Sequence, residues 1–189
     1  MTTHLDALLD EHRSIAAVLH AMRYLVRAKR DTGMKIDPQV FGAMLYYLDV
    51  FPERMHHPKE EAVFFDVLRQ RTHEADGVLE ELGREHKSGE DAIRVMEQAL
   101  LRYTQGGERE FADFAEKTEQ YIEGYLQHIR KEEEIVIPCA RRALTTEDWK
   151  RVEVAFAGNR DPLKGADPAD YRKLFTRIVN LAPPPVGLG

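Results

Sequence analysis

The fold is decided by two related stretches, His56-His-Pro-Lys-Glu-Glu-Ala-Val-Phe-Phe65 and His128-Ile-Arg-Lys-Glu-Glu-Glu-Ile-Val-Ile137. In each stretch a histidine is followed four residues later by a glutamate, which is Glu60 in the first and Glu132 in the second. On a helix, residues four positions apart project from the same face, about one turn apart. Each stretch therefore predicts a helix that turns one imidazole and one carboxylate toward the same point.

A further histidine precedes each stretch at a similar distance. His12 lies 44 residues before His56, and His86 lies 42 residues before His128, and each of the two earlier histidines directly follows a glutamate. The chain thus contains one pattern twice, and each copy offers two imidazoles and one carboxylate. Such groups bind iron, zinc and manganese. The duplication predicts a site for two metal ions.

The register of the first stretch has two solutions, because His56 with Glu60 and His57 with Glu61 are both four residues apart. In the second stretch, apolar residues stand three, four and five positions after the glutamate. Glu60 is followed in the same way, whereas the fifth position after Glu61 is Asp66. We therefore assign His56 and Glu60 to the site, and expect His57 and Glu61 at the surface or hydrogen-bonded behind the metal ligands.

Apolar residues recur at spacings of three and four along most of the chain, which predicts long helices with one inward face. We expect an all-α, up-down four-helix bundle with a metal-binding histidine projecting inward from each helix. Pro52 and Pro58 lie inside the second helix, where each removes a backbone donor, so we expect that helix to be irregular close to His56. The expected helices span about 3–30, 38–67, 74–103 and 108–144, and the second begins at an N-cap, Asp37, followed by Pro38.

The bundle is expected to occupy residues 1–144, and residues 145–189 to form a short helical C-terminal extension, partly extended and packed on the bundle. In this extension we expect one helix at 147–157, with Thr146 as its N-cap, and another at 168–179. The sequence assigns no chemistry to the extension.

Composition narrows the classes of function. The 189 residues are 43% hydrophobic, enough for one sizeable core, and the net charge of -6 disfavours a general nucleic-acid binder. No apolar run approaches the ~20 residues needed to span a bilayer, and no signal peptide is evident, so a cytoplasmic protein without a membrane partner is expected. The single cysteine, Cys139, excludes an internal disulfide and a zinc site built from several thiolates.

Over about residues 4–144 the chain resembles the hemerythrin-like, HHE cation-binding domains, which are di-iron four-helix bundles. The most specific parts are the two stretches quoted above and the pairs Glu11-His12 and Glu85-His86. The resemblance implies two iron ions, ferrous or ferric, with an oxo or hydroxo bridge. It implies four terminal ligands, which are His12, His56, His86 and His128, and two bridging carboxylates, which are Glu60 and Glu132.

The chain departs from the oxygen-carrying hemerythrins, which have another histidine one turn after the ligand on the third helix. Here that position is Glu90, an alternative ligand that the repeat does not support, since the matching residue after His12 is Ala16. A set of four histidines and two glutamates is more similar to the iron-centre repair proteins of nitrosative and oxidative stress. Tyr121 and Tyr125, before His128, either fill the core or hydrogen-bond a bound oxygen species, and core packing is the simpler interpretation.

Three functional hypotheses follow. The first is a non-haem di-iron protein that binds or reduces dioxygen, nitric oxide or peroxide, in stress response or iron supply, with electrons from an unidentified redox partner. The second is a non-catalytic oxygen or iron sensor, or an oxygen-binding protein. The third is a structural bundle stabilised by zinc. The sequence does not decide whether the protein is an enzyme.

Overall fold

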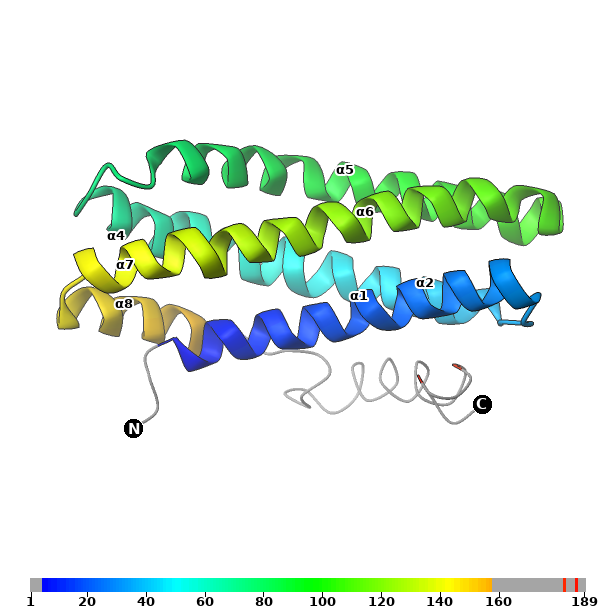
Figure 1. Ribbon diagram of the computed structural model, residues 1–189, viewed down its shortest axis with the longest axis horizontal. Coiled ribbons are helices and arrows are strands. Elements are labelled where there is room, and N and C mark those ends of the chain that lie inside the picture. Colours follow the sequence, from blue (N-terminus) through cyan, green and yellow to red (C-terminus); the bar gives the residue numbers. More distant parts are fainter. Residues whose placement is uncertain (1–4, 158–181, 183–185, 187–189) are drawn as a thin grey trace.

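The computed structural model describes residues 5–157, 182 and 186, and within these it contains helices and no strands (Figure 1). The all-helical fold predicted from the sequence is therefore confirmed. The helical elements are α1 (Asp6–Thr32), α2 (Pro38–Leu48), η1 (Asp49–His56), α3 (His57–Lys59), η2 (Glu60–Phe65), α4 (Asp66–Arg69), α5 (Asp76–Gly106), η3 (Gly107–Glu110), α6 (Phe111–Lys131), η4 (Glu132–Val136), α7 (Ile137–Ala143) and α8 (Thr146–Ala157).

Four long helical rods lie side by side, and Figure 1 shows successive rods running in opposite directions. The first rod is α1, the second runs without a break from α2 to α4, the third is α5, and the fourth is formed by α6, η4 and α7. Asp37 caps the second rod, because its carboxylate accepts a hydrogen bond from the backbone N–H of Gln39 at 2.9 Å. The third rod ends at Gly107, whose φ of 76° favours glycine.

The second rod is irregular, as its prolines predict. η1 and η2 are π-helical, and the backbone N–H of His57 bonds to the carbonyl of Pro52, five residues earlier. A proline has no N–H for the α-helical bond to the residue four before it, so Pro52 and Pro58 favour this wider winding. The fourth rod has a π-helical segment at the corresponding place, η4, just before Pro138. The stretches 56–65 and 128–137, which define the pattern in the sequence, thus contain or adjoin the π-helical segments of these two rods.

A polar layer divides the hydrophobic core into two clusters. In α1, Leu8 belongs to one cluster and Ile15 to the other, and His12 lies between them. Each of the other three rods also contributes residues to both clusters, and its site residues lie at the boundary between them. The duplicated pattern therefore forms a single layer across the middle of the bundle, with an apolar cluster on each side.

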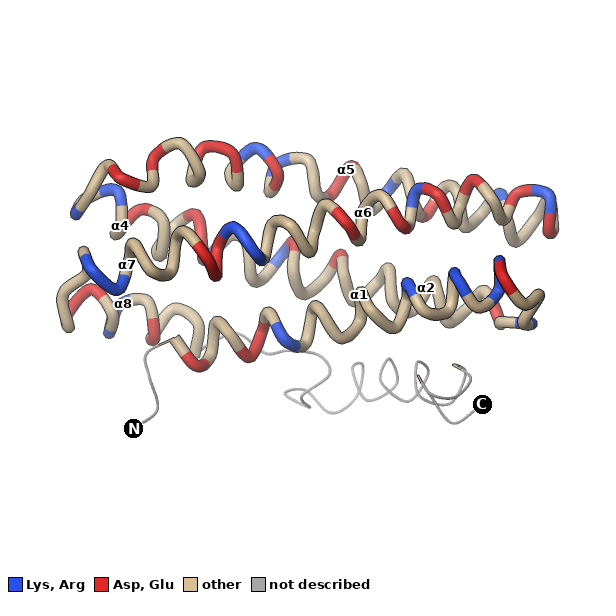
Figure 2. Tube along the Cα trace, in the orientation of Figure 1, with Lys and Arg blue, Asp and Glu red and all other residues tan. Residues whose placement is uncertain are grey.

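The helix α8 packs against the end of the bundle, where its Val152 and Phe156 are buried in the same cluster as Phe64 and Phe65. Figure 1 shows it beside α7 and the beginning of α1. The helix expected at 168–179 and most of the closing segment lie outside the described residues. Acidic and basic residues are interleaved along all four rods (Figure 2). Over the described part of the chain, no helix combines the length and apolarity that crossing a bilayer requires.

The N-cap of α8 is one residue earlier than predicted. Thr145 Oγ1 accepts a hydrogen bond from the backbone N–H of Asp148, and Asp148 Oδ2 accepts one from the backbone N–H of Thr145 at 2.9 Å. This reciprocal pair is a capping box, and Thr146 lies inside the helix. Arg71 donates to both carboxylate oxygens of Asp148 at 2.8 and 3.0 Å, and so joins α8 to the end of the second rod.

We predict that Thr145→Ala lowers the free energy of unfolding by about 1 kcal/mol, the usual effect of losing a threonine cap. Thr146→Ala is the matched control, because the Thr146 side chain is exposed and the change should stay within about 0.5 kcal/mol. Urea denaturation of the two variants measures both values. A larger loss in Thr146→Ala than in Thr145→Ala would show that the cap is assigned to the wrong residue.

Candidate metal centre

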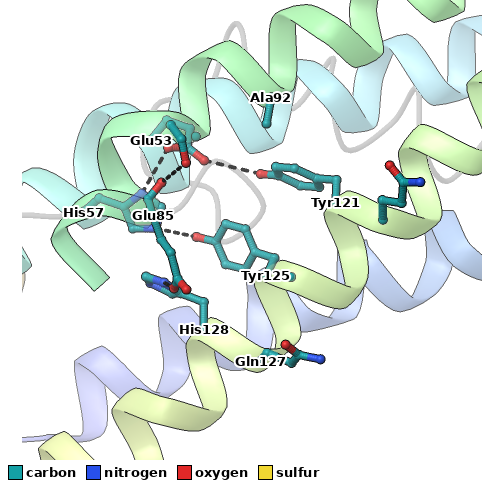
Figure 3. Close-up of a pocket in the computed structure, with 12 residues that line it drawn as sticks. Glu53, His57, Glu85, Ala92, Tyr121, Tyr125, Gln127 and His128 are labelled. Atoms are coloured by element: carbon teal, nitrogen blue, oxygen red, sulfur yellow. Dashed lines mark hydrogen bonds and ion pairs between the residues drawn. The ribbon is translucent and has the colours of Figure 1, made fainter. Parts of the chain in front are cut away.

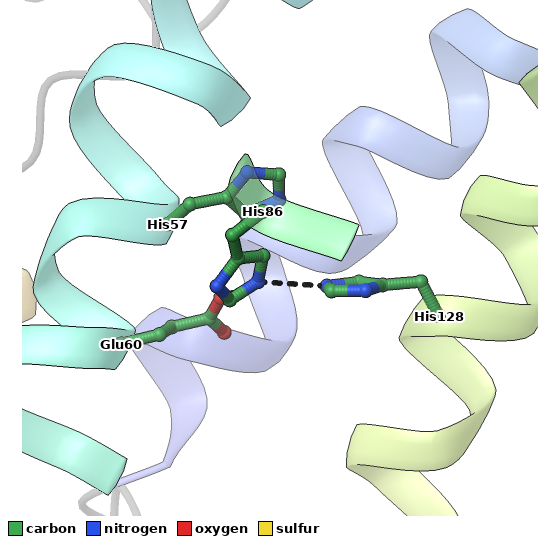
Figure 4. Close-up of side chains that lie close together, drawn as sticks. All are labelled: His57, Glu60, His86 and His128. Carbon is green, nitrogen blue, oxygen red and sulfur yellow. Dashed lines mark hydrogen bonds and ion pairs between the residues drawn. The ribbon is translucent and has the colours of Figure 1, made fainter. Parts of the chain in front are cut away.

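The structure brings all six predicted residues together in two adjacent groups. One group consists of His12, His56, Glu60 and Glu132, and within it the ligand atoms lie within 4.8 Å of one another. The second group contains His86, His128 and Glu60, and also His57 (Figure 4). Glu60 belongs to both groups. The side chains come from all four rods, so the complete set exists only when the bundle is closed.

The two carboxylates each face both groups. Glu60 Oε1 lies 3.2 Å from His56 Nε2 and 3.6 Å from His12 Nε2, whereas its Oε2 lies 3.5 Å from His86 Nε2. Glu132 is arranged in the same way, with Oε2 toward the first group and Oε1 3.4 Å from His128 Nε2. Each carboxylate therefore offers one oxygen to each of two positions, as a bridging ligand does.

Several buried polar atoms at this point have no hydrogen-bond partner. They are both carboxylate oxygens of Glu60, both of Glu132, and Nε2 of His12. Leaving a buried polar group unpaired costs about 1–3 kcal/mol, and more when it is charged. The Nε2 atoms of His86 and His128 are 3.0 Å apart, the separation of two nitrogens that bind one metal ion at right angles at about 2.1 Å each. The residues present fit a pair of metal ions.

Each predicted histidine ligand is oriented by a carboxylate at its other ring nitrogen. Glu11 accepts from His56 Nδ1 at 2.7 Å, and Glu85 accepts from His128 Nδ1 at 2.8 Å. These two contacts are equivalent in the repeat, since each glutamate precedes the first histidine of its own copy and holds the second. An ionised carboxylate can only accept, so Nδ1 carries the hydrogen and Nε2 of the neutral imidazole keeps its lone pair for a metal.

The glutamates that follow Glu60 and Glu132 orient the other two histidines. Glu133 accepts from His12 Nδ1 at 3.0 Å, and Glu61 accepts from His86 Nδ1 at 3.1 Å. These contacts cross from one copy of the repeat to the other. The expectation that Glu61 lies behind a metal ligand agrees with this contact.

Of the two expectations for His57, a position at the surface is wrong. It is 5% exposed, and its ring stacks on that of His86 with centroids 4.1 Å apart. Nδ1 donates to Glu53 at 3.1 Å, so the lone pair of Nε2 accepts the hydroxyl hydrogen of Tyr125 at 2.7 Å. His57 therefore lies in the second group with a hydrogen-bonding partner on each nitrogen.

The sequence did not place His57 among the ligands, because adjacent residues of an α-helix point in different directions. The irregularity expected near the prolines did not say where its side chain would point. The π-helical winding around Pro52 and Pro58 turns His56, His57 and Glu60 all toward the interior. Those prolines were the available signal. They predicted irregular winding, but not that both histidines would be buried.

The remaining alternatives from the sequence are resolved by position. Glu90 is exposed and paired with Arg94 at 3.2 Å, away from both groups, so it is not an additional ligand. Tyr121 donates to Glu53 at 3.3 Å, and Tyr125 to His57. Their hydroxyls thus belong to a hydrogen-bonded set beside the second group. Cys139 is buried, as expected for a small apolar side chain.

In the protein without metal, protons on histidines balance the buried carboxylates. Burial lowers the pKa of His56 and His128, but nearby carboxylates, chiefly Glu60 and Glu132 respectively, outweigh it and raise these pKa values to about 9 and about 10. Burial and the charge of Glu60 raise the pKa of Glu132, but His128 and His12 outweigh them and bring it to about 2. Metal ions at this site must therefore displace protons.

The stacked pair His57 and His86 behaves differently. Burial lowers the pKa of His57 to about 3 and that of His86 to about 4, and the positive charge of neighbouring histidines adds to the effect. Both imidazoles are therefore neutral near pH 7 and need lose no proton before they bind a metal. In the second group only His128 holds a proton that a metal ion must displace, whereas in the first group both His12 and His56 do, because nearby carboxylates outweigh burial and raise the pKa of all three.

The model for the hemerythrin HHE cation-binding domain matches residues 3–140, a range that contains every residue of both groups. The chain belongs to the hemerythrin family. The resemblance noted in the sequence is thereby confirmed, and the family, together with the two groups of ligand atoms, makes this a metal-binding protein. Searches of curated proteins and of solved structures found no match to the chain.

We predict that the metal-free protein becomes less stable as the pH rises from about 6.5 to about 10. Over this interval the folded protein keeps protons on His56 and His128 that the unfolded chain has released, so a rise in pH favours unfolding. Urea denaturation of chelator-treated protein at several pH values measures the slope.

Metal-loaded protein is the control, because its ligands hold metal instead of protons and metal affinity increases with pH. Its free energy of unfolding should therefore not fall over the same interval. A metal-free protein that gains stability between pH 6.5 and 9 would contradict the assignment of protons to these histidines.

Proposed function

We propose that this hemerythrin-family protein is a non-haem di-iron protein that binds or reduces dioxygen, nitric oxide or a peroxide, in oxidative or nitrosative stress or in iron supply. One observation carries the proposal. Glu60 and Glu132 are buried, their four oxygens have no hydrogen-bond partners, and each carboxylate turns one oxygen to each group of ligands. Such a pair of carboxylates suits two adjacent ions better than one.

Iron is the metal that makes this arrangement most useful. Imidazole and carboxylate ligands also suit zinc and manganese, so the donor atoms alone do not select it. Two iron ions, when bound, supply two electrons and coordination positions that the protein leaves open for a small ligand. We take His12, His56, His86 and His128 as terminal ligands, and His57 as a nearby imidazole available to the second ion.

The residues of the chain hold the site in position and shield it from water along the bundle axis. Carboxylates at the Nδ1 atoms fix the rings of the four terminal ligands, so that their Nε2 atoms meet in the middle layer. The hydrophobic clusters on both sides of this layer exclude water along the bundle axis. Side reactions with solvent are thereby reduced, and the electrostatic effect of the carboxylates is strengthened.

Reduction of a peroxide breaks its O–O bond, consumes two electrons and two protons, and yields water together with a second molecule of water or an alcohol. Two bound ferrous ions would supply the electrons, and solvent would supply the protons. We propose that an external one-electron donor, a protein or a small molecule, then restores the ferrous state. The cycle is balanced without any other oxidant or reductant.

We predict that Glu60→Gln reduces the iron content from about two ions per chain to less than one, because it weakens a ligand shared by both positions. Glu61→Gln is the matched comparison, since Glu61 meets the site only at the outer nitrogen of His86 and otherwise pairs with Arg69. It should retain both ions, with an affinity weakened by about 10- to 100-fold. Metal analysis after equilibrium dialysis gives both results, and the opposite ranking would mean that the register is wrong.

The proposed function is tested by loading the full chain with ferrous iron and adding hydrogen peroxide without oxygen. We expect about one peroxide consumed for two ferrous ions, with a change in the optical spectrum, and spectral changes with nitric oxide and dioxygen. A protein that retains zinc in the presence of iron, and responds to none of these ligands, would contradict the proposal and favour a structural role.

A further inference from the structure

A half-open cavity of about 210 Å³ lies between α5 and α6, beside the second group of ligands. Figure 3 shows Glu53, His57, Tyr125 and His128 gathered at its inner end. His57 and His128 belong to the second group, so the cavity reaches that group directly. None of the residues found only in the first group lines it.

Small residues make the space. Gly124 of α6 lines the cavity and has no neighbour within 4 Å of the position that a Cβ atom would occupy. Ala92 faces it from α5. Gly89 has a separate purpose, because a Cβ there would lie 2.1 Å from Glu53 Oε2, so the glycine provides the room in which the Glu53 carboxylate is held against His57.

The cavity is larger than a diatomic ligand needs. Protein cavities of about 150 Å³ can hold benzene. The space therefore fits an organic molecule of about six non-hydrogen atoms.

The walls and the inner end have different chemistry. Ala92, Gly124 and the rings of Tyr121 and Tyr125 offer apolar surface. At the inner end, the Tyr121 and Tyr125 hydroxyls donate to Glu53 and His57 and keep lone pairs with which to accept another hydrogen bond. A ligand with an apolar body and one hydroxyl-type head group matches both parts.

Charge disfavours an anionic ligand. The cavity is lined by two carboxyl groups, those of Glu53 and Glu85, and by no lysine or arginine. Glu85 pairs with Lys131 and orients His128, so the lining itself offers a carboxylate ligand no cation that is not already paired. The lining therefore selects a neutral molecule.

The first group is covered from another side. The ring of Phe156, from α8, meets the ring of His56 with centroids 5.9 Å apart, and Phe51 lies on His56 at 6.4 Å. Both phenylalanines are buried. The two metal positions thus differ, one being covered by aromatic rings and the other bordered by a cavity.

We propose that this cavity binds a small neutral organic molecule with a hydroxyl or hydroperoxyl head group. In the iron-loaded protein, the ligand that reacts is an alkyl hydroperoxide. This inference deepens the proposed function and rests on it for the reaction, but not for binding. Reduction would break the O–O bond with two electrons and two protons and release an alcohol and water.

Binding is tested with the zinc-loaded full chain, in which no redox reaction occurs, by titrating 2-methyl-2-butanol and following backbone amide signals by NMR. We expect saturable shifts confined to residues 53–57, 85–92 and 120–128. Gly124→Leu and Ala92→Leu should weaken binding by about tenfold or more. Gly124→Leu should not impair folding, because leucine favours a helix more than glycine by about 1 kcal/mol.

Gly77→Leu is the matched control, since Gly77 is also on α5 with no neighbour near its Cβ position but does not line the cavity. It should bind the alcohol as the unchanged chain does. Absence of saturable shifts, or unchanged binding in both Gly124→Leu and Ala92→Leu, would overturn the proposal.

The iron-loaded protein separates this inference from the proposed function. We expect it to consume tert-butyl hydroperoxide, about tenfold more slowly in Gly124→Leu and at the unchanged rate in Gly77→Leu. If the zinc-loaded protein binds the alcohol but the iron-loaded protein consumes no peroxide, the proposed function fails while the binding site stands. Failure of alcohol binding with continued consumption of hydrogen peroxide overturns only the cavity assignment.

Discussion

The structure depends on the burial of two carboxylates in the middle of a helical bundle. Glu60 and Glu132 are at most 1% exposed, and their carboxylate oxygens have no hydrogen-bond partner. Removing an ionised group from water costs several kcal/mol, which only close positive charge can offset. Protons on histidines provide that charge in the metal-free protein, and metal ions provide it when bound. The need for cations at this layer explains why every rod contributes a histidine there.

The duplicated pattern makes the layer nearly symmetric, and the exceptions give it direction. Glu11 and Glu85, like Glu61 and Glu133, have equivalent contacts with the histidines. His57 has no counterpart, because the equivalent residue after His128 is Ile129. It adds an imidazole to one group only, the group beside the cavity, whereas Phe156 covers the other. The two groups of ligand atoms therefore differ, one being enclosed and the other accessible.

Much of the fold could be predicted from the sequence, because helical periodicity and the His-x-x-x-Glu spacing are local properties. They indicated the helical rods and identified six residues that the structure places together in the two groups. Of the two alternatives for His57, the surface position was wrong, because burial of two adjacent residues requires π-helical winding, which the prolines suggest but do not specify. The cavity was unpredictable for a different reason, since it depends on Gly89, Ala92 and Gly124 meeting Tyr121 and Tyr125 across two rods. The predicted N-cap of α8 was wrong by one residue, because Thr145 and Thr146 are equally suitable caps from sequence alone.

The central claim is that Glu60 and Glu132 together hold two metal ions between them. X-ray absorption spectroscopy at the iron edge of the loaded protein tests it most directly, because it reports both the ligands and any neighbouring metal. The account predicts nitrogen and oxygen ligands at about 2.0–2.2 Å and a second iron within about 4 Å. An iron spectrum with no neighbouring metal, from protein shown to be fully loaded, would contradict it.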